Sequence, residues 1–342
     1  MTTEKRQRKF VGKLSRWLIP IAISVGAIWL LLRDIDFSTI VLNLGKIDFK
    51  IYLYATLVYF VSYFFRAFSW YVLLRRKVSF KDAFFSMGAG YLLNNLFPFR
   101  LGEIGRAVLL DDPDGPSALE VLSSVLVERI FDVFLAAVFV LSMLPRILGG
   151  AFDQTLILIA FILTTVGLAV LYLAARFRTR IAAWLERWGK RSVFVSRWIA
   201  PKAVQVLEGL SVLNNPGAFL LAFGSLGVSW LIAFAENYIV FQSLYPNPPF
   251  WWMIFVLSAG AFGAALPSVP AGLGVFEGVM VAAFAFLGVG AEVAFTHAIV
   301  IHALAFIYSN LFGLIGLRLR GEAVVGLYRR VVQRSPNIES VK

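Results

Sequence analysis

Cysteine is absent from the 342 residues, and histidine occurs only at His297 and His302. The absence of cysteine excludes disulfides, thiolate metal sites and thiol nucleophiles. Charged residues make up only 15 % of the chain, whereas hydrophobic residues make up 59 % and the mean hydropathy is +0.79. A soluble domain is typically about half apolar and about a quarter charged. The composition therefore predicts a membrane protein, not a soluble, disordered or disulfide-rich chain.

Motifs of common enzyme classes are missing as well. The sequence contains no Gly-x-x-x-x-Gly-Lys-Ser/Thr, no His-Glu-x-x-His and no Gly-x-Ser-x-Gly. It therefore predicts no nucleotide hydrolysis by a P-loop and neither of two common hydrolase sites. The two histidines are five residues apart and share a helical face poorly, which makes them a weak metal pair. We expect neither a metal nor a cofactor.

Positive charge is abundant and unevenly distributed. The 32 Lys and Arg residues outnumber the 20 Asp and Glu residues, which gives a net charge of +12. The basic residues gather between the apolar blocks, mainly in the first 16 residues, in segment 176–215 and in the tail 318–342. This pattern is typical of cytoplasmic segments that face anionic lipid rather than nucleic acid. It predicts an inner-membrane protein with both termini and an amphipathic 176–215 linker in the cytoplasm.

The apolar segments predict an all-α polytopic fold in which residues 1–342 form one membrane domain. Six segments are expected to be full spans: Trp17–Leu32, Ile51–Leu74, Leu119–Leu144, Leu156–Ala175, Ala218–Phe241 and Val293–Leu317. Two more, Ala83–Leu110 and Phe250–Val289, are interrupted by Asn, Pro and Gly. Irregular backbone at membrane depth needs protein or water around it. We expect two re-entrant helical hairpins, the first entering from inside and the second from outside; the alternative is two kinked spans.

A shift of 172 residues aligns the two interrupted segments. The matches are Ser86 with Ser258, Gly88 with Gly260, Ala89 with Ala261, Pro98 with Pro270, Leu101 with Leu273, and Gly102 with Gly274. Because each segment lies between two spans, the sequence predicts repeats over 50–145 and 216–317 with opposite orientation. Inverted repeats with broken helices are a construction of secondary transporters, whose site lies near the midplane where the broken helices meet.

Ionisable side chains inside the apolar segments indicate where a site lies, because each costs at least a few kcal/mol in a bilayer. Glu128, Arg129 and Asp132 fall near the middle of one span, and Arg129 can reach Asp132 at the i,i+3 spacing. This group is expected either to touch a substrate or to form a self-neutralised structural pairing. Arg66, inside the second span, either faces the same region or snorkels to the inner surface.

The first interruption is rich in charge, and the second is nearly neutral. Arg100, Glu103 and Arg106 follow the first, and two guanidiniums beside a broken helix end suit phosphate binding. The second has Glu277 and no arginine. This asymmetry fits an anionic headgroup bound from the cytoplasmic side; the alternative is an ordinary positive-inside loop. Proton carriers or hydrogen-bonded anchors are expected at Glu236, Glu277, His297 and His302.

Four segments resemble the lysylphosphatidylglycerol synthase transmembrane-region family, a family of flippase-like proteins, over about Tyr52 to Leu317. They are the run Arg66–Leu74 and the blocks Asn94-x-x-x-Pro98-x-Arg100-x-Gly102-Glu103-x-x-Arg106, Glu128-Arg129-x-x-Asp132 and Pro267-x-x-Pro270-x-Gly272-x-Gly274-x-x-Glu277. The resemblance implies movement of a lipid between leaflets and, without the family's cytoplasmic synthase domain, no aminoacyl transfer. Ala271 stands where the family usually has glycine, and His302 stands near a frequent arginine; both departures leave the lipid open.

We therefore predict a protein, not an enzyme, that translocates an anionic or zwitterionic phospholipid or related lipid. Expected substrate-binding residues are Arg66, Asn94, Arg100, Glu103, Arg106, Glu128, Arg129, Asp132 and Glu277, with Glu236, His297 and His302 as secondary candidates. Expected partners are a lipid with a phosphate headgroup, the bilayer and a lipid-synthesising enzyme. The alternatives are a membrane-embedded transferase acting on a lipid or polyprenyl carrier, with Glu103 or Asp132 catalytic, and a non-transporting partner of a lipid synthase.

Overall fold

The protein is helical throughout the part that its computed structural model describes. The described residues are 26, 29, 33, 35–97, 100–147, 154–189, 203–204, 207, 214–265 and 270–340. The expected first span, Trp17–Leu32, lies almost wholly outside them, as does most of the linker between 190 and 213. The described residues form α-helices joined by short turns, with no strand among them.

Five helices correspond to expected spans. They are α3 (Phe49–Leu73), α6 (Ala118–Ile147), α7 (Gln154–Arg176), α10 (Pro216–Phe241) and α13 (Ala291–Leu319). Within the described ranges, α3, α10 and α13 are long and apolar enough to cross a membrane. The 30-residue helix α6 is longer, but its apolar surface is interrupted by Glu128, Arg129 and Asp132. These three charges near its middle distinguish α6 from α3, α10 and α13.

Three shorter helices lie outside both the expected spans and the two interrupted segments. Helix α8 (Arg178–Gly189) falls in the predicted amphipathic linker, whereas α2 (Phe37–Lys46) and α14 (Val324–Ser340) occupy segments for which the sequence predicted no helix. The α2 helix begins at Asp36, whose carboxylate accepts the Ser38 amide N–H. Hydrogen bonds from Ser38 and Thr39 lower the pKa of the Asp36 carboxyl to about 2. Helix α14 buries Leu327 and Val331 against the core.

The first interrupted segment forms a helical hairpin of α4 (Phe80–Leu96) and α5 (Leu101–Leu110). Asn94 and Asn95 do not break the helix as expected but lie in its last turn, because the break comes only at Phe97 and Arg100. Arg100 has a left-handed backbone with φ 52°. Gly90 and Gly102 bring the two backbones so close that a Cβ at Gly102 would clash with the Gly90 carbonyl. Small residues therefore allow the chain to fold back on itself.

The second interrupted segment has the same plan. Helix α11 (Trp251–Ala265) is followed by a 3₁₀ turn, η3 (Pro270–Gly272), and by α12 (Val275–Ala285). Residues 266–269, which include Pro267, lie outside the described part. Gly263 of α11 faces Val279 of α12, so these helices also pack side by side in opposite directions. Helix–break–helix hairpins are thus present in both expected segments.

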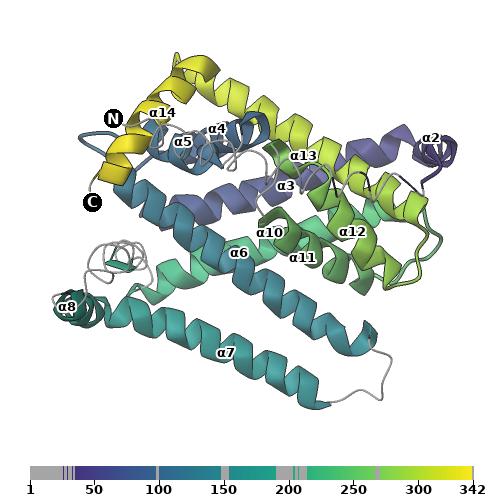
Figure 1. The fold of residues 1–342 in the computed structure, drawn as a ribbon, viewed down its shortest axis with the longest axis horizontal. Helices are drawn as coiled ribbons and strands as arrows, with labels where there is room; N and C mark the ends of the chain where they lie inside the picture. The colour runs from purple at the N-terminus through teal and green to yellow at the C-terminus, as the bar shows by residue number, and fades with distance from the viewer. Residues whose placement is uncertain are drawn as a thin grey trace, which may run out of the picture.

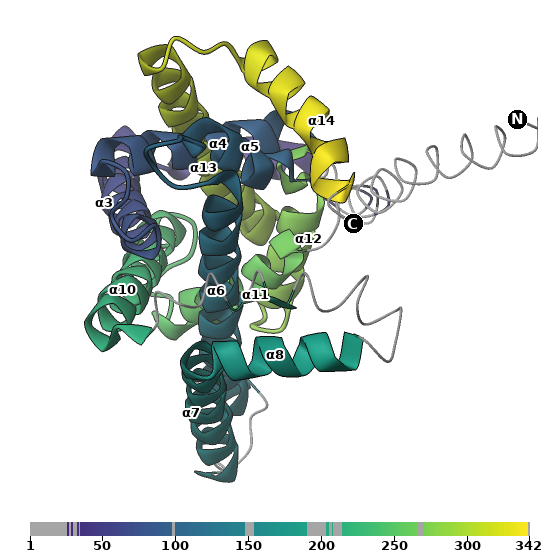
Figure 2. The same ribbon diagram turned by 90° about the vertical axis from the view of Figure 1, so that its left-hand side faces the viewer.

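Packing between the two halves is reciprocal. Helix α3 packs along α10, α4 packs against α13, and α11 packs against α6. Figure 2 shows α6 between the α3–α10 pair and the α11–α12 hairpin. Hydrogen bonds hold the α3–α10 contact: the Ser62 hydroxyl donates to the Ser229 carbonyl at 2.9 Å, and the Ser69 hydroxyl to the Ala222 carbonyl at 2.8 Å. Such polar contacts join helices where water does not compete.

The two hairpins open toward opposite ends of the bundle. At one end, Arg320 at the end of α13 donates both to Asp82 at the start of α4 and to the Leu109 carbonyl at the end of α5. At the other end, Arg146 of α6 lies over the ring of Trp251 at the start of α11. In Figure 1, α5, α8 and α14 accordingly lie at one end and α2 at the other. The 3₁₀ turn η3 of the second hairpin packs against α4 of the first.

We expect Gly88→Ala to lower stability, because a methyl group there would lie 2.8 Å from the Gly313 backbone nitrogen of α13. Overpacking of this kind costs about 1–3 kcal/mol. The matched control is Gly224→Ala in α10, whose Cβ would meet nothing within 4 Å. Thermal unfolding in detergent should show a lower melting temperature for Gly88→Ala alone; equal melting temperatures would contradict the α4–α13 contact.

Candidate functional site: a charged cavity between the hairpins

A cavity of about 660 Å³ lies where the two hairpins meet the long helices. Its walls come from α3, α4, α5, α6, α10, α11, η3, α12 and α13. Seven of the residues proposed from sequence line it: Arg66, Arg100, Glu103, Arg129, Asp132, Glu236 and His302. The remaining five, Asn94, Arg106, Glu128, Glu277 and His297, are not among its lining residues.

Arg66 and Asp132 form a bidentate ion pair at the cavity wall. The guanidinium donates from its two terminal nitrogens to both carboxylate oxygens, at 2.8 and 2.9 Å. Trp230 of α10 donates its indole N–H to the same carboxylate at 3.1 Å. Arg66 therefore does not snorkel to the inner surface: a bidentate partner on α6 holds it inside the bundle.

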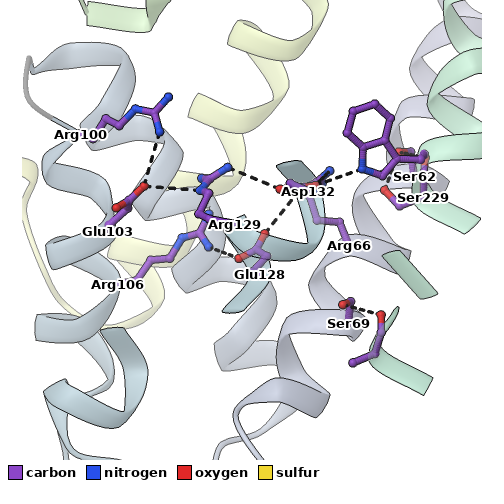
Figure 3. Close-up of polar contacts among 12 residues, drawn as sticks. Ser62, Arg66, Ser69, Arg100, Glu103, Arg106, Glu128, Arg129, Asp132 and Ser229 are labelled. Atoms are coloured by element: carbon purple, nitrogen blue, oxygen red, sulfur yellow. Dashed lines mark hydrogen bonds and ion pairs between the residues drawn. The ribbon is translucent and has the colours of Figure 1, made fainter. Parts of the chain in front are cut away.

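A looser chain of charges continues from this pair toward the first hairpin (Figure 3). Arg129 lies 3.6 Å from Asp132, as the i,i+3 spacing predicted, and 3.4 Å from Glu103 of α5. Glu103 in turn lies 4.0 Å from Arg100. Both contacts of Arg129 are longer than a typical N–H···O hydrogen bond, so its guanidinium is held less firmly than that of Arg66.

Glu128 and Arg106 form a separate pair beneath the cavity. Their side chains are 0 % and 1 % exposed, and a terminal nitrogen of Arg106 lies 2.8 Å from a Glu128 oxygen. The Arg106 guanidinium also lies over the rings of Trp70 and Tyr91, at 5.0 and 4.9 Å from the ring centres. Glu128 makes a second, longer contact of 3.5 Å to Arg66. This pair joins α5 and α6 to α3.

Arg100 and Arg106 were expected to bind a phosphate together, but only Arg100 lines the cavity. Arg106 points into the protein, where a carboxylate and two aromatic rings surround it. The arginines that line the cavity are Arg66, Arg100 and Arg129. Sequence spacing missed this because positions 100 and 106 lie nearly two turns apart and on different sides of α5.

Asn94 and Glu277 serve the ends of the broken helices. The Asn94 side-chain oxygen accepts the Gly102 amide N–H at 2.7 Å, and a Glu277 oxygen accepts the Gly274 amide N–H at 2.7 Å. The other Glu277 oxygen bonds Nδ1 of His302. Because helix starts leave amide groups without partners, both side chains satisfy backbone at the interruptions.

The remaining secondary candidates separate into two kinds. His297 is fully buried, and its Nε2 lies 3.1 Å from the Asn237 side-chain oxygen, so it anchors α13 to α10. Glu236 is 5 % exposed and lines the cavity. Within the described ranges, no cluster of three His, Asp or Glu side chains is arranged to hold a metal ion.

Sequence reasoning missed the uncharged part of the wall. Tyr59, Tyr91 and Trp230 line the cavity, and only their place on the inner faces of α3, α4 and α10 marks them. At the rim, Val133 is 51 % exposed and Leu126 40 % exposed although both belong to the cavity lining. The cavity therefore has a charged interior and an apolar mouth at the surface of the bundle.

A charged cavity inside a largely apolar helical bundle defines a membrane protein with an internal polar site. The lysylphosphatidylglycerol synthase TM region family matches residues 17–313, and the chain belongs to this family. A UPF0104 membrane protein of Methanothermobacter thermautotrophicus (strain Delta H) is 27 % identical over 142 residues, which cover 40 % of this chain and 40 % of that protein. The chain thus matches less than half of this relative's length. No solved structure matches the chain.

Replacing Arg106 with methionine should destabilise the fold, because Glu128 would stay buried beside only its longer contact to Arg66. Breaking a buried pair costs about 3–5 kcal/mol, and adding Glu128→Gln should recover part of the loss. The control is Lys77→Met, which removes an exposed partner of Glu120 and should cost under about 1 kcal/mol. Thermal unfolding measures all three, and equal losses for Arg106→Met and Lys77→Met would refute the scaffold role.

Proposed function

We propose that the protein moves a lipid with an anionic or zwitterionic phosphate headgroup between the leaflets of the inner membrane. One observation carries the proposal: a charged cavity at the meeting point of two broken helices reaches an apolar surface. A headgroup needs polar partners and its acyl chains need hydrocarbon, and this arrangement offers both at one place. Membership of a lipid-related membrane family supports the same reading.

Arg100 and Arg129 are the proposed headgroup ligands. Both line the cavity, and the contacts of Arg129 to Glu103 and Asp132 are 3.4 and 3.6 Å long, so a phosphate can compete for its guanidinium with little loss. Guanidiniums bind phosphate through two parallel N–H···O bonds, which favours this class of ligand. Arg66 is already held in a bidentate pair and serves to keep Asp132 in place.

The acyl chains are proposed to leave through the apolar mouth. Leu126 and Val133 of α6, Phe262 of α11 and Phe306 of α13 line the cavity and are also exposed. Side chains of this kind face lipid without cost. The headgroup would then cross the bilayer inside the protein while its chains stay in the membrane.

The bilayer is proposed to run across the bundle so that α4–α5 and α11–α12 are re-entrant hairpins of an inverted repeat. Their opposite openings and the reciprocal packing of the two halves support this placement. The basic segments then lie in the cytoplasm, as the positive-inside rule favours.

Cysteine labelling tests this topology on a chain that has no native cysteine. In intact cells, Lys81→Cys, Asp114→Cys and the reference Arg187→Cys should resist a membrane-impermeant maleimide. Asn247→Cys and Gly290→Cys, at the two ends of the second hairpin, should react. These residues are exposed in the structure, so access depends on the side of the membrane. Reaction at one end of a hairpin only would show a full crossing instead.

Translocation itself is tested in liposomes that contain the purified protein and fluorescent phosphatidylglycerol. Wild type should expose inner-leaflet lipid to an external quencher faster than empty liposomes do. Arg129→Ala should lose most of the gain, at least about tenfold if one charge-assisted contact of about 1.5–3 kcal/mol is lost. Arg180→Ala, an exposed arginine of α8, is the matched control and should behave as wild type.

Two outcomes would contradict the proposal. Lipid exposure at the rate of empty liposomes with several anionic and zwitterionic lipids would exclude translocation. A new lipid species detected by mass spectrometry when candidate donors are added would favour a membrane-embedded transferase.

A further inference from the structure

Glu236 stands apart from the other carboxylates of the cavity. Within the described part of the chain, no hydrogen bond or ion pair reaches it, although its side chain is 95 % buried and lines the cavity. Glu103 and Asp132 contact arginines. An ionised carboxylate is costly to bury without a partner, so such a group takes up a cation, of which the proton is the smallest.

The position of Glu236 on α10 places it in the headgroup cavity but away from the arginines. The cavity face of α10 runs through Ser229, Trp230, Ala233, Glu236 and Asn237. Trp230 contacts Asp132, and Glu236 follows it by six residues, or about 9 Å along a helix. The carboxylate therefore acts on the headgroup through the charge of the shared cavity and not as a partner of the arginine cluster.

The charge of the cavity depends on whether Glu236 carries a proton. Besides Glu236, the Arg, Asp and Glu residues that line the cavity are Arg66, Arg100, Arg129, Glu103 and Asp132. Three positive and two negative charges leave one net positive charge when Glu236 is protonated and none when it is ionised. An anionic headgroup is therefore held more strongly by the protonated form.

The helices around α10 offer few competing groups. Titratable side chains that face this region are Tyr59 and Arg66 of α3, Arg129 and Asp132 of α6, and His297 and His302 of α13, whereas α11 contributes only Leu257, Ala261 and Phe262 to the cavity. Asn237 engages His297, and Glu277 engages His302. Glu236 is thus the carboxylate left to change the charge of the cavity.

We propose that Glu236 binds one proton together with an anionic lipid headgroup, so that the lipid and the proton enter and leave the cavity as a pair. This inference rests on the proposed function, because it needs a headgroup in this cavity. The proton comes from water on one side and returns to water, and no covalent bond of the lipid changes. Binding linkage then requires that lipid favours protonation by the same factor as protonation favours lipid.

Binding of phosphatidylglycerol to the intact protein in detergent tests the linkage. Wild-type affinity should fall as the pH rises, by up to about tenfold per pH unit, because one proton is taken up with each lipid. In weakly buffered solution with an indicator dye, lipid addition should raise the pH. Glu236→Gln, which mimics the protonated carboxyl, should show constant affinity and no proton uptake. Glu186→Gln on exposed helix α8 should behave as wild type.

The outcomes separate this inference from translocation. Wild-type pH dependence in Glu236→Gln, or no proton uptake by wild type, would overturn it even if liposomes show rapid lipid movement. A response to sodium in place of protons would also overturn it. Proton uptake that Glu236→Gln abolishes would support it even where no lipid crosses the bilayer. In liposomes with an imposed pH gradient, the ratio of rates with and without the gradient should differ from one in wild type and equal one in Glu236→Gln.

Discussion

The structure depends on neutralising charge in the middle of an apolar bundle. Glu128 of α6 is fully buried and is held by Arg106 of α5 and, at longer range, by Arg66 of α3. Without these partners an ionised carboxylate in such a place would cost several kcal/mol. The network therefore fixes the angle at which the first hairpin meets α3 and α6. Arg129, Glu103 and Arg100 extend this network, and all three line the cavity beside it.

Much of the fold could be predicted from sequence because its signals are local. Apolar length predicted α3, α10 and α13, and the 172-residue repeat predicted that α4–α5 and α11–α12 share one plan. The site could be predicted from the sequence only in part. The spacing of Arg129 and Asp132 lies within one helix and was predicted correctly. Two ion pairs, Arg106 with Glu128 and Arg66 with Asp132, join different helices. Residue spacing along the chain does not predict such contacts.

The errors concern contacts and helix stability that the apolar pattern of the sequence does not record. An arginine near an apolar segment can satisfy its charge at the membrane surface or by a carboxylate inside, and sequence shows only the first possibility directly. For Arg66 the sequence left both possibilities open, and the structure shows the second; Arg106, which was expected to bind phosphate, also pairs with a carboxylate inside. Asn94 was expected to end a helix and instead accepts an amide N–H from across the break. The unexpected helices α2 and α14 are short, and their stability comes from a cap or from packing against the core, neither of which apolar length records.

The division of work between broken and continuous helices limits which residues can bind a ligand. Each break leaves amide groups that need acceptors, and Asn94 and Glu277 supply them. Side chains committed to the backbone cannot also exchange partners with a passing headgroup without opening the hairpin. Under the proposed function, the charges that exchange partners with a headgroup therefore lie on α6 and α10, in Arg129 and Glu236. The hairpins give the cavity its shape, whereas the charges that can change partners lie mostly on helices that run without interruption.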